Sequence, residues 1–272
     1  MGTIYEPLPG WNAWVTTGGT RTEVKCRRPW QQPFELLIDP EHCPFCNRGR
    51  DEKNALEGVP GGWRLLSNAY TPHRGHLLAI PAQCSSVEKL ITLGGIQGIR
   101  EALSLITMRV ASEDAEIVSS AHIGWHAGQN VGHLHWHIYR LITRAPFSGA
   151  VYPLKGREDR LVRRFETATV FADGIRSGEC LVLPSAGSRT DELPEIISWL
   201  IGHCAERFRD PVSGLPPEYS VTFRFGRAGQ LRYAAYCPIL TQWGAAEVVC
   251  APLEGSPFTL PWPHKVTAKY LR

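Results

Sequence analysis

The stretch that decides the fold is Ala127–Gly128–Gln129–Asn130–Val131–Gly132–His133–Leu134–His135–Trp136–His137–Ile138. It joins a glycine-containing loop to a run in which histidines alternate with apolar residues. A β-strand has a side-chain period of two, so we expect a strand over 133–141 with its imidazoles on one face. Leu134, Trp136 and Ile138 would then pack into the core. A solvated edge strand or a surface metal site would also place polar residues on one face. Three histidines at every second position favour a functional site instead.

The residue types in this stretch fit chemistry at phosphorus. A neutral imidazole can attack phosphorus as a nucleophile, and a second imidazole can donate a proton to the phosphate or to the leaving group. Backbone amides of a loop such as 128–132 can hold phosphate oxygens. The stretch therefore predicts a site for a phosphorylated substrate.

Length and composition narrow the class of protein. The chain has 272 residues, 43% of them hydrophobic and 20% charged, with a formal net charge of +3. This balance predicts a folded protein and disfavours nucleic acid as a partner. No apolar run approaches the roughly 18 residues of a membrane-spanning helix, and no secretory signal is apparent. We expect a cytoplasmic protein without a membrane partner, whose 8 cysteines are thiols or metal ligands rather than disulfides.

The order of expected elements predicts an α+β fold with an antiparallel sheet. Strands are expected over 34–39, 63–68, 75–81 and 116–124, with a helical stretch through 110 that two glycines interrupt at 94–95. A similar order recurs about 101–103 residues later, with strands at 178–184 and 219–225 around a helix at 191–208.

This recurrence predicts an internally duplicated chain with units at 1–150 and 151–272. The second unit has Tyr233–Ala234–Ala235–Tyr236–Cys237 after its loop, where the first has its histidines. We therefore expect one working site per chain and a degenerate second unit.

The residues 127–138 resemble the signature of the histidine triad superfamily. Gly75–His76–Leu77–Leu78–Ala79–Ile80–Pro81 is similar to that superfamily's second hallmark, a histidine that opens a strand ending in proline. Together the two motifs cover roughly residues 35–145. The doubled architecture is similar to the galactose-1-phosphate uridylyltransferase (GalT-like) branch. The resemblance implies a nucleotide or nucleotide-sugar substrate.

The resemblance also implies a role for each matching residue. His135, the middle histidine, would be the catalytic nucleophile that forms a nucleotidyl-histidine at the α-phosphate. His137 would contact the phosphate and assist the leaving group. His76 would lie near the phosphate and Asn68 near the ribose. Further phosphate-binding positions would be Gln129, Asn130 and the backbone of Val131.

The acceptor stays open at this point. The uridylyltransferase branch usually carries glutamine where this chain has His137, and histidine there is typical of hydrolase branches and of some phosphorylases. We favour transfer of the nucleotidyl group to phosphate or a sugar phosphate, with hydrolysis by water as the alternative. A zinc-stabilised nucleotide-binding protein without turnover is a third reading. Both a monomer and a homodimer are compatible with the sequence.

Cysteines supply a candidate metal site. Cys43–Pro44–Phe45–Cys46 is a CxxC motif that by itself fits zinc, redox chemistry or chance. Cys84 stands where related proteins often have a zinc-binding histidine, and the first triad histidine, His133, is their fourth ligand. The resemblance thus implies a structural Zn²⁺ held by Cys43, Cys46, Cys84 and His133, with buried free thiols as the alternative. A metal at His133 would pin the segment that presents the nucleophile.

Overall fold

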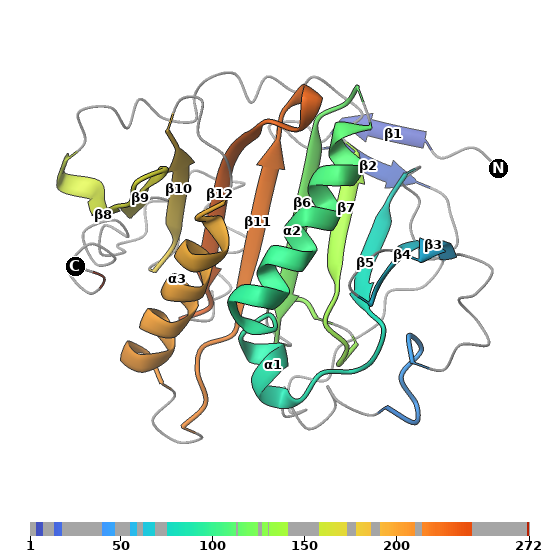
Figure 1. The fold of residues 1–272 in the computed structure, drawn as a ribbon, viewed down its shortest axis with the longest axis horizontal. Coiled ribbons are helices and arrows are strands. Elements are labelled where there is room, and N and C mark those ends of the chain that lie inside the picture. Colours follow the sequence, from blue (N-terminus) through green and yellow to red (C-terminus); the bar gives the residue numbers. More distant parts are fainter. Residues whose placement is uncertain are drawn as a thin grey trace.

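A broad antiparallel sheet with helices on one face organises the chain (Figure 1). The computed structural model describes residues 4–7, 14–17, 40–46, 55–58, 62–68, 75–112, 114–124, 127–129, 131–140, 158–172, 178–185, 191–209, 214–240 and 271. Within these ranges the sheet has ten strands, in the spatial order β3-β4-β5-β7-β6-β11-β12-β10-β9-β8. This arrangement confirms the predicted α+β class and antiparallel sheet.

The first five strands come from the first half of the chain: β3 (Ala55–Gly58), β4 (Trp63–Ser67), β5 (Leu77–Pro81), β6 (Ile117–Ile123) and β7 (Trp136–Arg140). The others come from the second half: β8 (Leu161–Arg164), β9 (Ala168–Ala172), β10 (Cys180–Pro184), β11 (Tyr219–Phe225) and β12 (Leu231–Pro238). A separate pair is formed by β1 (Ile4–Pro7) and β2 (Trp14–Thr17). The helices are α1 (Val87–Ile91), α2 (Gly95–Ala111) and α3 (Leu193–Arg207), with short 3₁₀ turns η2 (Glu158–Arg160) and η3 (Arg227–Gly229).

The two halves use the same order of elements. In the described residues each half has three strands of the large sheet, then its helical part, then two strands, and the two strand orders mirror each other across the β6–β11 pair. This topology is the one a repeat would produce, while the duplication itself and the division at 150/151 stay predictions. The division and the expected strand over 34–39 lie outside the described residues.

Two glycines divide the predicted helical stretch into α1 and α2. Gly94 and Gly95 have φ values of 79° and 69°, a left-handed conformation that side chains with a Cβ rarely adopt. The helical stretch is therefore interrupted at this point, as the sequence predicted.

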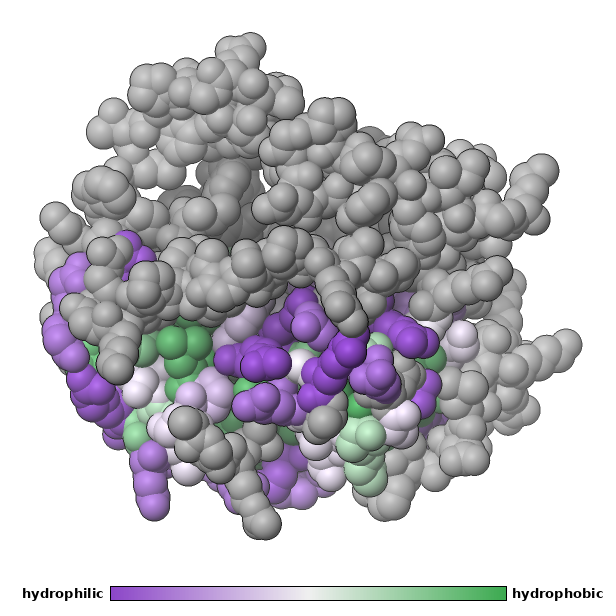
Figure 2. Space-filling view, turned by 90° about the horizontal axis from the view of Figure 1, so that it is seen from above, coloured by the Kyte–Doolittle hydropathy of each residue, from purple (hydrophilic) through white to green (hydrophobic). Residues whose placement is uncertain are grey.

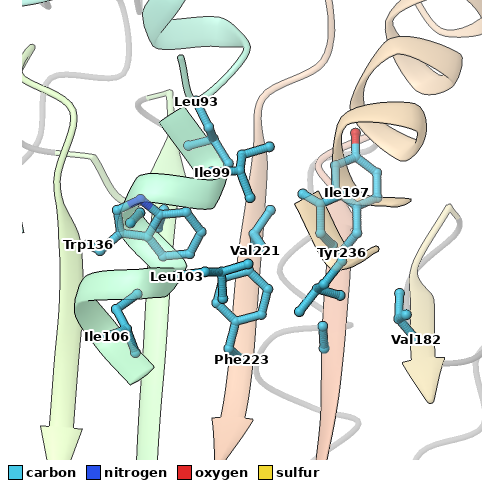
Figure 3. Packing of buried hydrophobic residues seen from close by; sticks show 14 of the residues in the cluster. Leu93, Ile99, Leu103, Ile106, Trp136, Val182, Ile197, Val221, Phe223 and Tyr236 are labelled. Atoms are coloured by element: carbon cyan, nitrogen blue, oxygen red, sulfur yellow. The ribbon is translucent and has the colours of Figure 1, made fainter. Parts of the chain in front are cut away.

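The main core lies between the helices and one face of the sheet. Leu93, Ile99, Leu103 and Ile106 come from α2 and the turn before it, and they point at the sheet (Figure 3). Sheet residues of both halves meet them, and Trp136 stacks on Phe223 with ring centroids 5.0 Å apart. Burial of these large apolar side chains stabilises the fold and joins its two halves.

The histidine run enters the sheet later than predicted. Strand β7 begins at Trp136, whereas a strand from 133 onward was expected. Before Trp136, histidine side chains bond backbone carbonyls that a strand ladder would otherwise use. The ring of His133 bonds the Pro81 carbonyl, and the ring of His135 bonds the His133 carbonyl. The alternation itself is confirmed, since Leu134, Trp136 and Ile138 belong to the core cluster. The histidine side chains therefore lie on the sheet face that the helices leave uncovered.

Charged pairs connect the halves at the end of the sheet near η3. Arg224 on β11 pairs with Glu116, and Arg227 lies 3.9 Å from Asp114.

Seen from above, the described part of the surface is mostly hydrophilic, with smaller hydrophobic patches between the hydrophilic residues (Figure 2). Among the described helices, none combines the length and hydropathy needed to cross a bilayer.

Candidate functional site

Four metal-ligand side chains converge beside the histidine run. The ligand atoms of Cys43, Cys46, Cys84 and His133 all lie within 4.8 Å of one another. The three sulfur atoms stand 3.3–3.5 Å from Nδ1 of His133, and the sulfur atoms of Cys46 and Cys84 are 3.3 Å apart. The structure thus brings together the four residues of the predicted metal site, which come from the CxxC turn, the segment after β5 and the segment before β7.

The donor set and its geometry fit a tetrahedral ion. Zn–S bonds of about 2.3 Å and Zn–N bonds of about 2.05 Å would place sulfur and nitrogen about 3.5 Å apart. Burial raises the pKa of the Cys43 and Cys84 thiols above the usual value, so a cation is what would favour their ligating thiolate form. The backbone N–H of Cys84 also donates to the sulfur of Cys46 at 3.3 Å. The cluster could therefore bind a metal ion.

The hydrogen bond of His133 orients it as a ligand. Its Nε2–H donates to the Pro81 carbonyl at 2.8 Å, which leaves Nδ1 with the lone pair facing the cysteines. Burial lowers the pKa of His133 to about 4, so the ring is neutral near pH 7. Both properties are those required of a metal-ligating imidazole.

His135 presents a defined tautomer as well. Its Nδ1–H donates to the His133 carbonyl at 2.7 Å, so the lone pair of the neutral ring is on Nε2. The side chain is buried, and burial lowers its pKa below the usual value. Phe45, between Cys43 and Cys46 of the candidate metal site, has its ring centroid 5.8 Å from that of His135. A neutral imidazole held in one orientation is suited to nucleophilic attack.

His137 belongs to a chain of side chains with a direction. The amide nitrogen of Asn68 donates to Nδ1 of His76 at 3.2 Å, its nearer ring nitrogen, because an amide –NH₂ only donates. Nε2–H of His76 then donates to Nδ1 of His137 at 2.9 Å. This sequence leaves His137 with its remaining proton on Nε2. Burial, followed by the neighbouring His135, lowers the pKa of His137, so the ring is a neutral donor.

The loop around Gln129, which the sequence predicts to hold phosphate, is braced from within. The side-chain Oε1 of Gln129 accepts from the Gly124 N–H at 2.8 Å, and its Nε2 donates to the Val131 carbonyl at 3.1 Å. Gly128 has a φ of 104°, which favours glycine at this turn. The Gln129 side chain is thus directed into the loop, Asn130 lies outside the described residues, and the phosphate contacts of 129–131 stay predictions.

Three further residues, Tyr139, His122 and Ser220, lie beside the histidines of the site. Tyr139 stacks on His76 with centroids 4.1 Å apart, and His122 lies 5.8 Å from the His137 ring, centroid to centroid. Ser220, from the second half, is 2.8 Å from Nδ1 of His122. Tyr139 continues the alternation of 133, 135 and 137, so a signal for it existed. No local pattern pointed to Ser220.

Comparison with known proteins supports the fold. No family model and no curated protein matches the sequence. Among solved structures, an ADP-glucose phosphorylase from Arabidopsis thaliana with bound ADP-glucose superposes with a TM-score of 0.59 and 14% identity, covering 100% of this chain and 98% of that one. A GalT-like protein from the same plant has a TM-score of 0.60 and 15% identity, with 100% and 99% covered. A uridylyltransferase has a TM-score of 0.60 and 18% identity, with 99% and 97% covered. The chain therefore has the GalT-like fold over its length, as its motifs predicted.

Proposed function

We propose that this protein is a nucleotidyltransferase that cleaves a nucleotide or nucleotide sugar at the α-phosphate through a covalent nucleotidyl-His135. The observation that carries the proposal is the hydrogen bond from Nδ1–H of His135 to the His133 carbonyl, because it leaves Nε2 of a buried neutral ring as the nucleophile. The solved structures of the same fold include a uridylyltransferase and a phosphorylase with bound ADP-glucose, which supports the reaction type.

The first half-reaction transfers the nucleotidyl group to the protein. The Nε2 lone pair of His135 attacks the α-phosphorus and forms an N–P bond, while the bond to the bridging oxygen breaks. The leaving group departs with that electron pair, and Nε2–H of His137 donates a hydrogen bond to the departing oxygen or to the phosphate. The chain from Asn68 through His76 supports this role because it keeps the His137 proton on Nε2.

The second half-reaction regenerates the imidazole. An oxygen of phosphate or of a sugar phosphate attacks the same phosphorus, the N–P bond breaks, and its electron pair returns to Nε2 of His135. Water as the acceptor would make the protein a hydrolase. The acceptor therefore distinguishes the two activities without changing the first half-reaction.

We propose Zn²⁺ as the resident ion of the Cys₃His cluster. Four protein ligands close a tetrahedral site, so the ion would hold structure rather than activate water. The ion at Nδ1 of His133 would fix the residue whose carbonyl accepts the hydrogen bond from His135.

The six described cysteines are free of disulfides, which supports a reducing compartment such as the cytoplasm.

Intact-protein mass spectrometry tests the covalent mechanism. The zinc-loaded protein is incubated briefly with nucleoside diphosphate sugars, dinucleoside polyphosphates and nucleoside phosphoramidates, one at a time. We expect a nucleoside monophosphate adduct on the wild type and on His203→Ala, whose histidine lies on α3 on the helix face. His135→Ala should bind the same amount of zinc as the wild type and give no adduct.

The acceptor is identified by adding candidate acceptors to the preformed adduct and measuring the loss of the adduct. Loss of the adduct with phosphate or a sugar phosphate, but not in buffer alone, supports transfer. Equal loss in buffer alone indicates hydrolysis. Saturable nucleotide binding with no adduct and no product across the panel would contradict the proposal in favour of a binding protein.

A further inference from the structure

Strand β11 of the second half runs directly beside β6 of the catalytic half. In their antiparallel register Ser220 pairs with His122. Tyr219 and Val221 lie in the core on the helix side. Because side chains alternate along a strand, Ser220 points to the face that carries the histidines, and so does Glu218 just before the strand. Two polar side chains of the second half therefore reach the candidate site.

Glu218 buttresses the turn that opens the phosphate loop. Its Oε2 accepts from the Ala127 N–H at 3.2 Å. Gly124 packs against the same side chain so closely that a Cβ there would lie 2.2 Å from Cγ of Glu218. The Gly124 carbonyl also accepts the Gln129 N–H at 3.0 Å, so both ends of the loop meet at the residue that Glu218 covers. The Glu218 backbone is itself held, because its carbonyl accepts from the Ile239 N–H at 2.7 Å.

Ser220 holds the ring of His122. Its hydroxyl is 2.8 Å from Nδ1, and the hydroxyl of Ser120 is 3.2 Å from Nε2. Both ring nitrogens are thus bonded, and rotation of the ring would break two hydrogen bonds. The held ring lies 5.8 Å, centroid to centroid, from His137.

We propose that Glu218 and Ser220 are positioning residues of the first-half site, an inference that rests on the proposed nucleotidyl transfer. Glu218 sets the loop that receives the phosphate, and Ser220 sets the ring of His122 beside that of His137. The second half therefore acts on catalysis although it lacks the histidines. Neither side chain takes part in bond making.

Amide exchange and histidine NMR test the positioning without relying on activity. Glu218→Ala should speed exchange of the Ala127 amide about five- to tenfold, the loss expected for one hydrogen bond, whereas Glu218→Gln keeps an acceptor oxygen and most of the protection. Ser220→Ala should shift the ¹⁵N resonance of Nδ1 in His122. Thr222→Ala, on the same face of the same strand, is the control and should change neither. Unchanged exchange in Glu218→Ala or an unchanged His122 resonance in Ser220→Ala overturns the corresponding assignment.

Adduct kinetics separate positioning from a merely structural role. In Glu218→Ala we expect the half-saturating substrate concentration to rise about tenfold, with Glu218→Gln restoring most of it. In Ser220→Ala we expect the maximal rate of adduct formation to fall about fivefold at an unchanged half-saturating concentration. Equal decreases in all variants, Thr222→Ala included, would overturn the inference. Absence of an adduct in the wild type would instead refute the proposed function, and the exchange and NMR results would still decide the positioning.

Discussion

The half-buried, uncharged His137 should make the protein acid-sensitive in a way that one substitution can isolate. Burial, together with the neighbouring His135, His76 and His122, lowers the pKa of His137 from 6.5 to about 2. The unfolded chain has no such burial and binds a proton at this position near pH 6.5. The stabilisation is therefore present above pH 6.5 and is lost as the pH falls from 6.5 towards 2.

The size of the effect follows from proton linkage. Between pH 7 and pH 5 the unfolded state gains a proton at this site while the folded state does not. Integration over that interval gives a loss of about 2 kcal/mol in the free energy of unfolding for one histidine. A domain of ordinary stability has about 5–15 kcal/mol in total, so the loss is measurable.

Urea unfolding of the wild type and His137→Gln at pH 7, 6 and 5 measures this difference. Glutamine does not titrate, so the variant should lose about 2 kcal/mol less than the wild type between pH 7 and pH 5. Any acid release of a metal from the Cys₃His cluster is common to both proteins and cancels in the comparison. His203→Gln is the control for removal of a histidine elsewhere, because that ring lies on α3 beside Arg207, outside the histidine cluster. Parallel stability curves for the wild type and His137→Gln would refute the argument that the folded protein keeps His137 neutral.

Three further predictions concern the metal, the histidine chain and the core. Elemental analysis should find one zinc ion per chain. Cys46→Ala should lose the metal and about 5 °C or more in Tm, whereas the control Cys237→Ala should keep both. Metal retained in Cys46→Ala would contradict the four-ligand site. Asn68→Ala should slow adduct formation about fivefold in rapid-quench mass spectrometry, because it removes the hydrogen bond to His76 that keeps the His137 proton on Nε2; an unchanged rate would show that this chain does not set the tautomer. Tyr219→Phe should cost about 1 kcal/mol in urea unfolding, because its hydroxyl donates to the Ile91 carbonyl at 2.6 Å; a variant of unchanged stability would show that this bond makes no net contribution.

The parts of the fold that follow from local spacing were predictable from the sequence. The alternation around Trp136 correctly assigned the core face and the histidine face of β7, because a period of two needs only neighbouring residues. The paired glycines at 94–95 correctly marked the break between α1 and α2. The metal cluster was predictable from a CxxC motif and a family pattern, and the structure brings its four residues together.

The parts that depend on long-range pairing were not predictable. The start of β7 was placed three residues too early, because the side-chain bonds of His133 and His135 to nearby carbonyls replace the ladder there. Ser220 reaches His122 only because β11 pairs with β6 in one particular register. A single sequence carries no local sign of such a register.

The same pairing explains why a second half without the histidine run keeps its fold. Without β11, strand β6 would be an exposed edge, and unpaired edges of a sheet invite association with other chains. The core also requires the second half, since Phe223 covers Trp136, whose neighbours in sequence are the two proposed catalytic histidines. Removing Phe223 would therefore loosen the strand that carries those residues. Three residues of the second half thus support the site: Phe223 packs on Trp136, Ser220 bonds His122, and Glu218 covers Gly124. None of them matches the motif of the first half.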